Sequence, residues 1–138
     1  MNIIEVASAI IIDQQGRLLL VRKKNTQFFM QVGGKLESGE HPEQALVREI
    51  FEEIGCRVQS LQFIAKVNTQ AANEPDHQLI SHTYFVELIG IAQLQAELAE
   101  MVWLKPEQVN DYLLAPLTKE FIVPWWLKHT LPTGQQAI

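Results

Sequence analysis

Apolar and polar positions along the chain fall into blocks that predict strands around one long helix. Ile3 to Ile12 is rich in β-branched residues, which is typical of a strand, and a turn signal at 13–16 separates it from the apolar run Leu18 to Arg22. These two runs predict a β-hairpin. A further strand is predicted at 27–32, where Gly33-Gly34 should end it. Later strands are predicted at 61–67, 83–88 and 101–104.

The clearest helix is predicted at 42–54. Pro42 suits the first helical position, Gly55 suits the position just past the end, and apolar residues recur every four positions at Leu46, Ile50 and Ile54. A short helix is predicted at 106–112 and a C-terminal helix at about 118–131, disturbed near its proline at 124. Strands around one long helix predict an α/β (α+β) fold with a mixed β-sheet.

Composition narrows the class of protein. The 138 residues are 47% hydrophobic and 20% charged, which fits a single globular domain, 1–138. The single cysteine, Cys56, excludes an internal disulfide. The longest apolar run, 6–12, is far shorter than the roughly 20 residues of a membrane helix, so we expect no membrane partner and a cytoplasmic location. The net charge of −5 argues against a nucleic-acid polymer as partner, but not against a small anion accompanied by a metal ion.

The predicted helix also has an acidic face. Glu49, Glu52 and Glu53 stand at i, i+3 and i+4, where like charges cost about 0.2–0.5 kcal/mol per pair. Arg48 offsets part of that cost. An acidic helix face is most often only a solvated surface, so the residues around the helix must decide between the two interpretations.

Those residues complete a known signature. Gly34 is followed after five residues by Glu40, and after seven more by Arg48-Glu49; Glu52-Glu53 and Gly55 close the pattern. At about 7% usage per residue type, seven such matches arise by chance on the order of once in 10⁸ windows. The segment 34–56 resembles the Nudix box, and the strand-rich segments around it resemble the order and length of the Nudix layout. The resemblance implies an α/β/α sandwich.

The resemblance also implies a metal site. Glu49, Glu52 and Glu53 are the expected metal ligands and catalytic residues, with Glu52 as the indispensable one. A backbone carbonyl near Gly34 would join them. Arg48 is expected to orient the carboxylates. Glu40 would tie the loop to the helix, and Gly33 and Gly55 would be structural. Hard oxygen ligands suit Mg²⁺, with Mn²⁺ as a substitute.

Some members of the family add a glutamate from a distant loop. Glu97 and Glu100 precede the strand predicted at 101–104, where such a residue is expected, and the sequence leaves both open. Arg22 and Lys23 end the second predicted strand and are candidates for binding substrate phosphate, although a solvated strand end explains them equally well.

The resemblance implies hydrolysis of a nucleoside diphosphate linked to another group. A compact chain most resembles members that act on nucleoside or deoxynucleoside triphosphates, releasing a monophosphate and pyrophosphate. ADP-ribose, nucleotide sugars and dinucleoside polyphosphates are alternatives. A non-catalytic Nudix-like module that binds a nucleotide or a protein is the alternative from another class, although such modules typically lose box glutamates. Nothing in the sequence separates a monomer from a homodimer.

Overall fold

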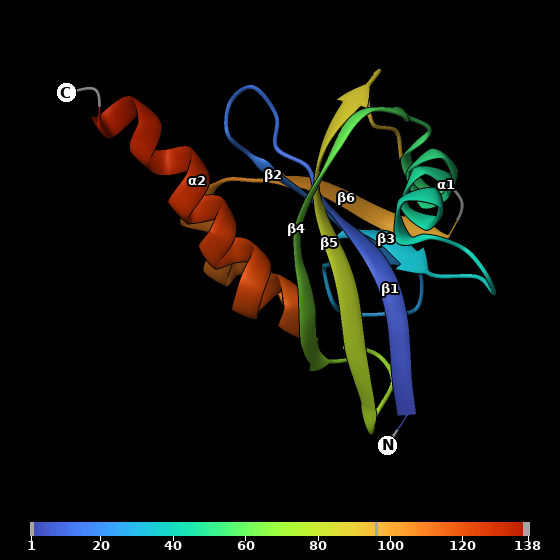
Figure 1. Ribbon diagram of the computed structural model, residues 1–138. Helices are drawn as coiled ribbons and strands as arrows, with labels where there is room; N and C mark the ends of the chain where they lie inside the picture. Colours follow the sequence, from blue (N-terminus) through green and yellow to red (C-terminus); the bar gives the residue numbers. More distant parts are fainter. Residues whose placement is uncertain (1, 96, 137–138) are drawn as a thin grey trace.

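The computed structural model describes residues 2–95 and 97–136 and contains a four-stranded mixed sheet (Figure 1). Strand β1 (Asn2–Ile10) pairs in parallel with β5 (His77–Ile89) and antiparallel with β3 (Val32–Lys35). Strand β4 (Arg57–Gln70) pairs antiparallel with β5, so the order is β3-β1-β5-β4. The predicted α+β class with a mixed sheet is confirmed. Residues 1, 96, 137 and 138 of the predicted domain lie outside the described part.

A second, two-stranded sheet pairs β2 (Leu18–Lys23) with β6 (Leu98–Leu104). The predicted β1–β2 hairpin is therefore wrong except at its turn. Among the described residues, the two segments pair only through one isolated bridge next to the turn, between Ile12 and Leu18. A strand has two edges, and β3 and β5 already occupy both edges of β1. The full length of β2 is left to pair with β6.

The glycine pair does not end a strand as predicted. Gly33 and Gly34 lie inside β3, opposite Ser8 and Ala7 of β1. Gly33 has φ 150°, and an added β-carbon there would collide with the carbonyl oxygen of Ala7. Glycine is needed at this position because the two backbones approach too closely for any side chain.

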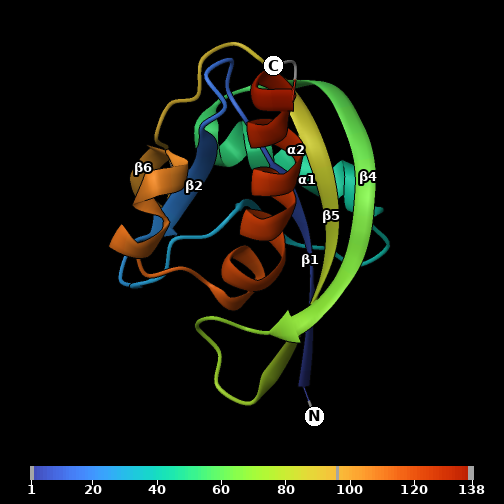
Figure 2. The ribbon, with the colours of Figure 1, turned by 90° about the vertical axis from the view of Figure 1, so that its left-hand side faces the viewer.

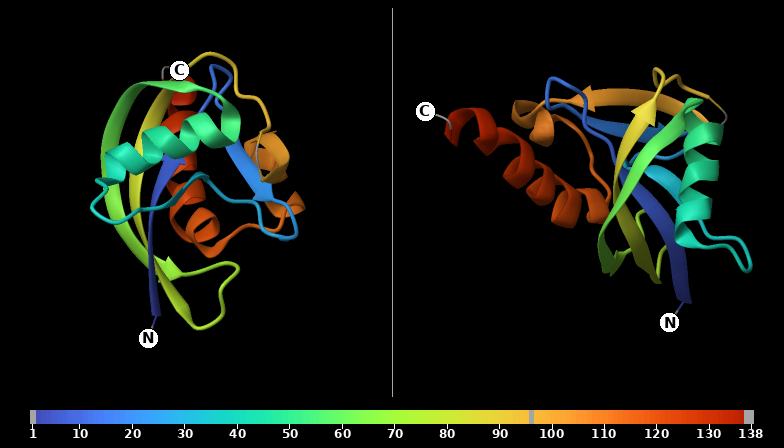
Figure 3. Two further views of the ribbon diagram at one scale, coloured as in Figure 1. Left: turned by 90° about the vertical axis from the view of Figure 1, so that its right-hand side faces the viewer. Right: turned by 45° about the horizontal axis from the view of Figure 1, so that its top comes forward.

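One helix covers each face of the four-stranded sheet. Figure 3 shows α1 (Pro42–Ile54) crossing one face, and Figure 2 shows α2 (Val123–Gln136) lying over the other, roughly along the strands. Leu46, Ile50 and Ile54 of α1 are fully buried in the first core. Ile122 and Trp126 are fully buried in the second. This is the expected sandwich, and no helix in the described ranges is long and apolar enough to cross a membrane.

The helix ends follow from the sequence. The Gln44 side chain accepts a hydrogen bond from the His41 amide (3.0 Å), and Gly55 at φ 70° closes the C-terminus of α1. The short segment η1 (Pro106–Asp111) is a 3₁₀ helix. The C-terminal helix is disturbed just before Pro124: η2 (Thr118–Ile122) is a π-helical segment, in which the Val123 amide bonds to the Thr118 carbonyl. Proline lacks the amide that a regular α-helix needs there.

Candidate functional site

The acidic face of α1 forms one wall of a cleft, and burial differs sharply along it. Glu53 is buried at 8% exposure, the Glu49 side chain is 17% exposed, and the Glu52 side chain is 52% exposed. The three side chains lie on the same side of α1 because positions i, i+3 and i+4 of a helix share a face. Glu53 also accepts a hydrogen bond from the Gly33 amide at 3.2 Å, which links the helix to β3.

Arg48 joins most of these carboxylates. It donates to both oxygens of Glu40 (Nε 3.0 Å, Nη2 2.9 Å), and its Nη1 lies 2.9 Å from Glu49 and 3.4 Å from Glu52. Its Nη2 also donates to the Lys35 carbonyl at 3.3 Å. The Arg48 hydrogen bonds lower the pKa of Glu40 to about 2. One guanidinium therefore fixes the loop before α1 and the acidic face of α1 together.

Burial disfavours the charged form of the two inner glutamates. Burial raises the pKa of Glu53 to about 7, although the Gly33 amide opposes the shift. Burial likewise raises the pKa of Glu49, against the hydrogen bond from Arg48. The Lys23 ammonium favours the charged form of both. Both carboxylates are partly desolvated, so a cation that compensates for the lost hydration would be favoured in the cleft.

The cleft has a volume of about 500 Å³. Its lining residues are Lys23, Gly34, Lys35, Glu49, Glu52, Glu53 and Glu97. The structure thus brings the three helix glutamates together with Glu97, the last residue of the β5–β6 loop. That loop is held against α1, since the Gln93 and Gln95 amides donate to the carbonyls of Ile54 (2.9 Å) and Glu53 (3.1 Å).

Two of the predicted site residues lie elsewhere. Glu100 pairs with Arg22 across β2 and β6, with Nη2 to Oε1 at 2.7 Å, and neither residue lines the cleft. Lys35, which does line it, was not among the predicted site residues. The available signal was its position directly after Gly34, at the end of β3, where its carbonyl accepts a hydrogen bond from Arg48 of α1.

The donor set fits a divalent cation by its chemistry. Four carboxylates and the backbone of a glycine offer the hard oxygen ligands that Mg²⁺ and Mn²⁺ prefer. As the side chains stand, no three His, Cys, Asp or Glu residues within 2–95 and 97–136 converge closely enough to surround an ion. Arg48 holds Glu49 and Glu52, so both would have to turn from the guanidinium toward the cation.

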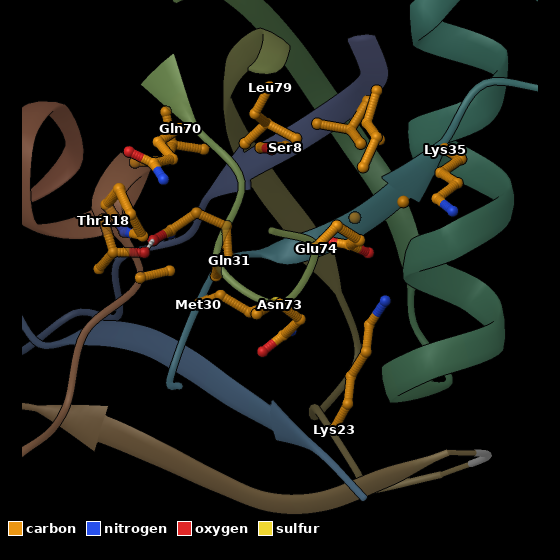
Figure 4. A pocket seen from close by; sticks show the side chains of 18 residues that line it. Ser8, Lys23, Met30, Gln31, Lys35, Gln70, Asn73, Glu74, Leu79 and Thr118 are labelled. Carbon is orange, nitrogen blue, oxygen red and sulfur yellow. Dashed lines mark hydrogen bonds between the residues drawn. The ribbon is translucent and has the colours of Figure 1, made fainter. Parts of the chain in front are cut away.

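A smaller pocket of about 110 Å³ adjoins the cleft and shares Lys23, Gly34 and Lys35 with it (Figure 4). One of its buried polar groups is the Gln31 amide, which donates to the Ala9 carbonyl (3.1 Å) and accepts from the Thr118 hydroxyl (2.9 Å). Apolar side chains and neutral amides make up most of the remaining wall, among them Met30, Leu79, Gln70 and Asn73. Neither Gln31 nor Thr118 was predicted as a site residue.

Known proteins resemble this chain over most of its length. Residues 3–125 match the family model of the NUDIX domain. The CTP pyrophosphohydrolase of Escherichia coli (strain K12) is 32% identical over 121 residues, covering 84% of this chain and 86% of that protein. The 8-oxo-dGTP diphosphatase of Haemophilus influenzae is 47% identical over 58 residues, 39% of this chain and 43% of that protein.

The fold gives the same result. The solution structure of the E. coli ORF135 protein superposes with a TM-score of 0.73 at 29% identity, covering 96% of both chains. The family model, the curated relative covered over most of its length and the fold all indicate the same family. The chain belongs to the Nudix family and is a Nudix hydrolase.

Proposed function

We propose that residues 1–138 act as one Nudix domain that hydrolyses a nucleoside or deoxynucleoside triphosphate to a monophosphate and pyrophosphate, with Mg²⁺ as the metal and Mn²⁺ as a substitute. The observation that carries this proposal is the lining of one cleft by four glutamates and two lysines. The lysines would contact phosphate oxygens that the carboxylates alone would repel.

We assign different roles to the residues in and around the cleft. Glu49, Glu52, Glu53, Glu97 and the Gly34 carbonyl would hold the metal. Arg48 would orient Glu49 and Glu52, which it contacts, and Lys23 and Lys35 would orient the phosphate chain. The metal, when bound, supplies charge neutralisation for the pyrophosphate and activates water for attack at phosphorus.

The adjoining pocket supports a nucleoside as the group attached to the phosphates. Apolar walls and the Gln31–Thr118 hydrogen bond offer a flat base both stacking surface and neutral hydrogen-bonding partners. The shared lysines lie where the base pocket meets the cleft, which matches a base connected to phosphates. The pyrophosphohydrolase and diphosphatase names of the two relatives agree with this substrate class.

The test is phosphorus NMR with Mg²⁺ and a mixed panel. The panel holds the common nucleoside triphosphates including CTP, 8-oxo-dGTP, ADP-ribose and a dinucleoside tetraphosphate. We expect one triphosphate to be consumed first, with pyrophosphate appearing, and Glu52→Gln to lose that turnover while remaining folded. Consumption of ADP-ribose alone would overturn the substrate class. Undiminished turnover in both Glu52→Gln and Glu53→Gln would overturn the metal assignment.

A further inference from the structure

Arg22 is directed away from the cleft, although the neighbouring Lys23 lines it. Its Nε donates to Glu100 Oε1 at 2.8 Å, and its Nη2 lies 2.7 Å from the same oxygen. Its Nη1 donates to the Thr26 carbonyl at 2.6 Å. The side chain is 23% exposed, so most of it is already packed against the protein. The planar guanidinium of an arginine holds a carboxylate and a carbonyl in one fixed geometry, which the flexible ammonium of a lysine does not impose.

The Thr26 carbonyl belongs to a tight turn that begins at Lys23 and is hydrogen-bonded to the backbone of Glu97. The Thr26 amide and hydroxyl donate to the Lys23 carbonyl (3.2 and 2.8 Å), with Asn25 at φ 64°. The Lys24 amide donates to the Glu97 carbonyl at 2.8 Å. The guanidinium of Arg22 therefore holds one end of a turn whose other contacts fix the backbone of Lys23 and of Glu97.

We propose that the Arg22–Glu100 pair is a clamp that positions Lys23 and Glu97 in the cleft, and that Arg22 does not bind the substrate. Its kinetic consequence rests on the proposed function, while its structural consequence does not. The Glu100 side chain is 55% exposed, and an ion pair with a solvent-exposed partner contributes little to folding stability. Small misplacements of a site group, by contrast, can lower a rate by up to about 10²-fold. The clamp should therefore matter to the site far more than to the fold.

The variants are Arg22→Met, Glu100→Ala and their double. Arg17→Met is the matched control, since its Nε donates to Asp13 Oδ2 at 2.7 Å beside the other end of β2, away from the cleft. With CTP and Mg²⁺, we expect Arg22→Met and Glu100→Ala each to lower kcat/KM roughly tenfold, mainly through KM. The double variant should fall no further, because both residues form one clamp. Arg17→Met should match the wild type.

Two kinetic results would overturn the proposal. If Glu100→Ala kept or lowered KM while Arg22→Met raised it, Arg22 freed from Glu100 would be binding phosphate itself. If Arg17→Met lowered kcat/KM as much as Arg22→Met, the effect would be a general weakening of β2.

A second measurement does not depend on activity. Amide hydrogen exchange, followed by NMR, should be at least about tenfold faster at Lys24 in Arg22→Met and in Glu100→Ala than in Arg17→Met. Unchanged exchange at Lys24 in Arg22→Met would overturn the clamp even in an active enzyme. Conversely, if the wild type hydrolysed no nucleotide but the exchange rates changed as expected, the proposed function would fail and the clamp would stand.

Discussion

The carboxyl group of Glu49 lies where a side chain on Gly34 would have to be: a β-carbon added to Gly34 would be 2.5 Å from the carboxyl carbon of Glu49. The missing side chain on β3 is what allows the Glu49 carboxylate to stand between α1 and the cleft. The neighbouring Gly33 is constrained differently, because an added β-carbon there would meet the backbone of β1. Gly34 is therefore required by the site, and Gly33 is required by the fold.

Gly34→Ala should displace Glu49 and leave the fold intact. The obstacle is the end of a side chain, which can rotate, so we expect little change in thermal stability but at least a tenfold loss of turnover. Gly33→Ala should instead destabilise the protein by about 2 kcal/mol or more, because backbone strain and a backbone collision coincide. Thermal unfolding and phosphorus NMR on both variants check this, and equal stability of the two would contradict it.

Glu53 should make the metal-free protein less stable as the pH rises. Its pKa is raised from 4.5 to about 7, so its contribution to stability is complete below pH 4.5 and is lost as the pH rises through 7. The shift corresponds to roughly 3 kcal/mol. Glu53→Gln should remove that loss at pH 8 and change little at pH 5, measured by urea unfolding in EDTA. Glu52→Gln, a change at a half-exposed position, is the control: it keeps Glu53 and should lose stability with rising pH as the wild type does.

Glu97→Gln should raise the Mg²⁺ concentration needed for half-maximal activity, since Glu97 is the cleft carboxylate that lies outside α1. We expect a shift of roughly 10- to 100-fold, the range typical for weakening a metal site. Glu107→Gln, an exposed change in η1, should match the wild type. An unchanged Mg²⁺ requirement in Glu97→Gln would remove Glu97 from the ligand set.

Thr118→Val should alter which nucleobase is preferred. The variant keeps the side-chain volume but leaves the Gln31 carbonyl oxygen without its hydrogen bond, at a cost of about 1–3 kcal/mol in stability. Gln31 should then reorient, and KM should change unequally among the nucleoside triphosphates. Thr69→Val is the control, because it removes a comparable hydroxyl bond, to Glu120, outside the pocket. Equal KM changes for every base would contradict a role in selection.

Much of the fold could be predicted from local signals. The bounds of α1 are as predicted because Pro42 and Gly55 mark its ends chemically. Strands β4 and β5 extend well beyond the predicted ranges, since polar residues such as Asn68 and Gln78 pair as well as apolar ones. The β1–β2 hairpin failed because strand pairing depends on which edges remain free, and that depends on distant segments.

The site divides in the same way. The acidic face of α1 could be placed from spacing alone, because helical periodicity fixes which residues share a side. The sequence could not decide between Glu97 and Glu100, since that choice depends on contacts with distant residues: Glu100 pairs with Arg22, whereas Glu97 lines the cleft. The Gln31–Thr118 bond joins residues 87 positions apart and has no sequence pattern that would mark it.

The hydrogen bonds from the Gln93 and Gln95 amides to the end of α1 mean that the Nudix box alone does not carry a complete site. Residues 34–56 carry the three helix glutamates and Arg48 wherever they are grafted, but the placement of Glu97 depends on that connection and on the amide of Lys24. A transplanted box would arrive without its fourth carboxylate. In this protein the box is one half of a site whose other half is built by residues far along the chain.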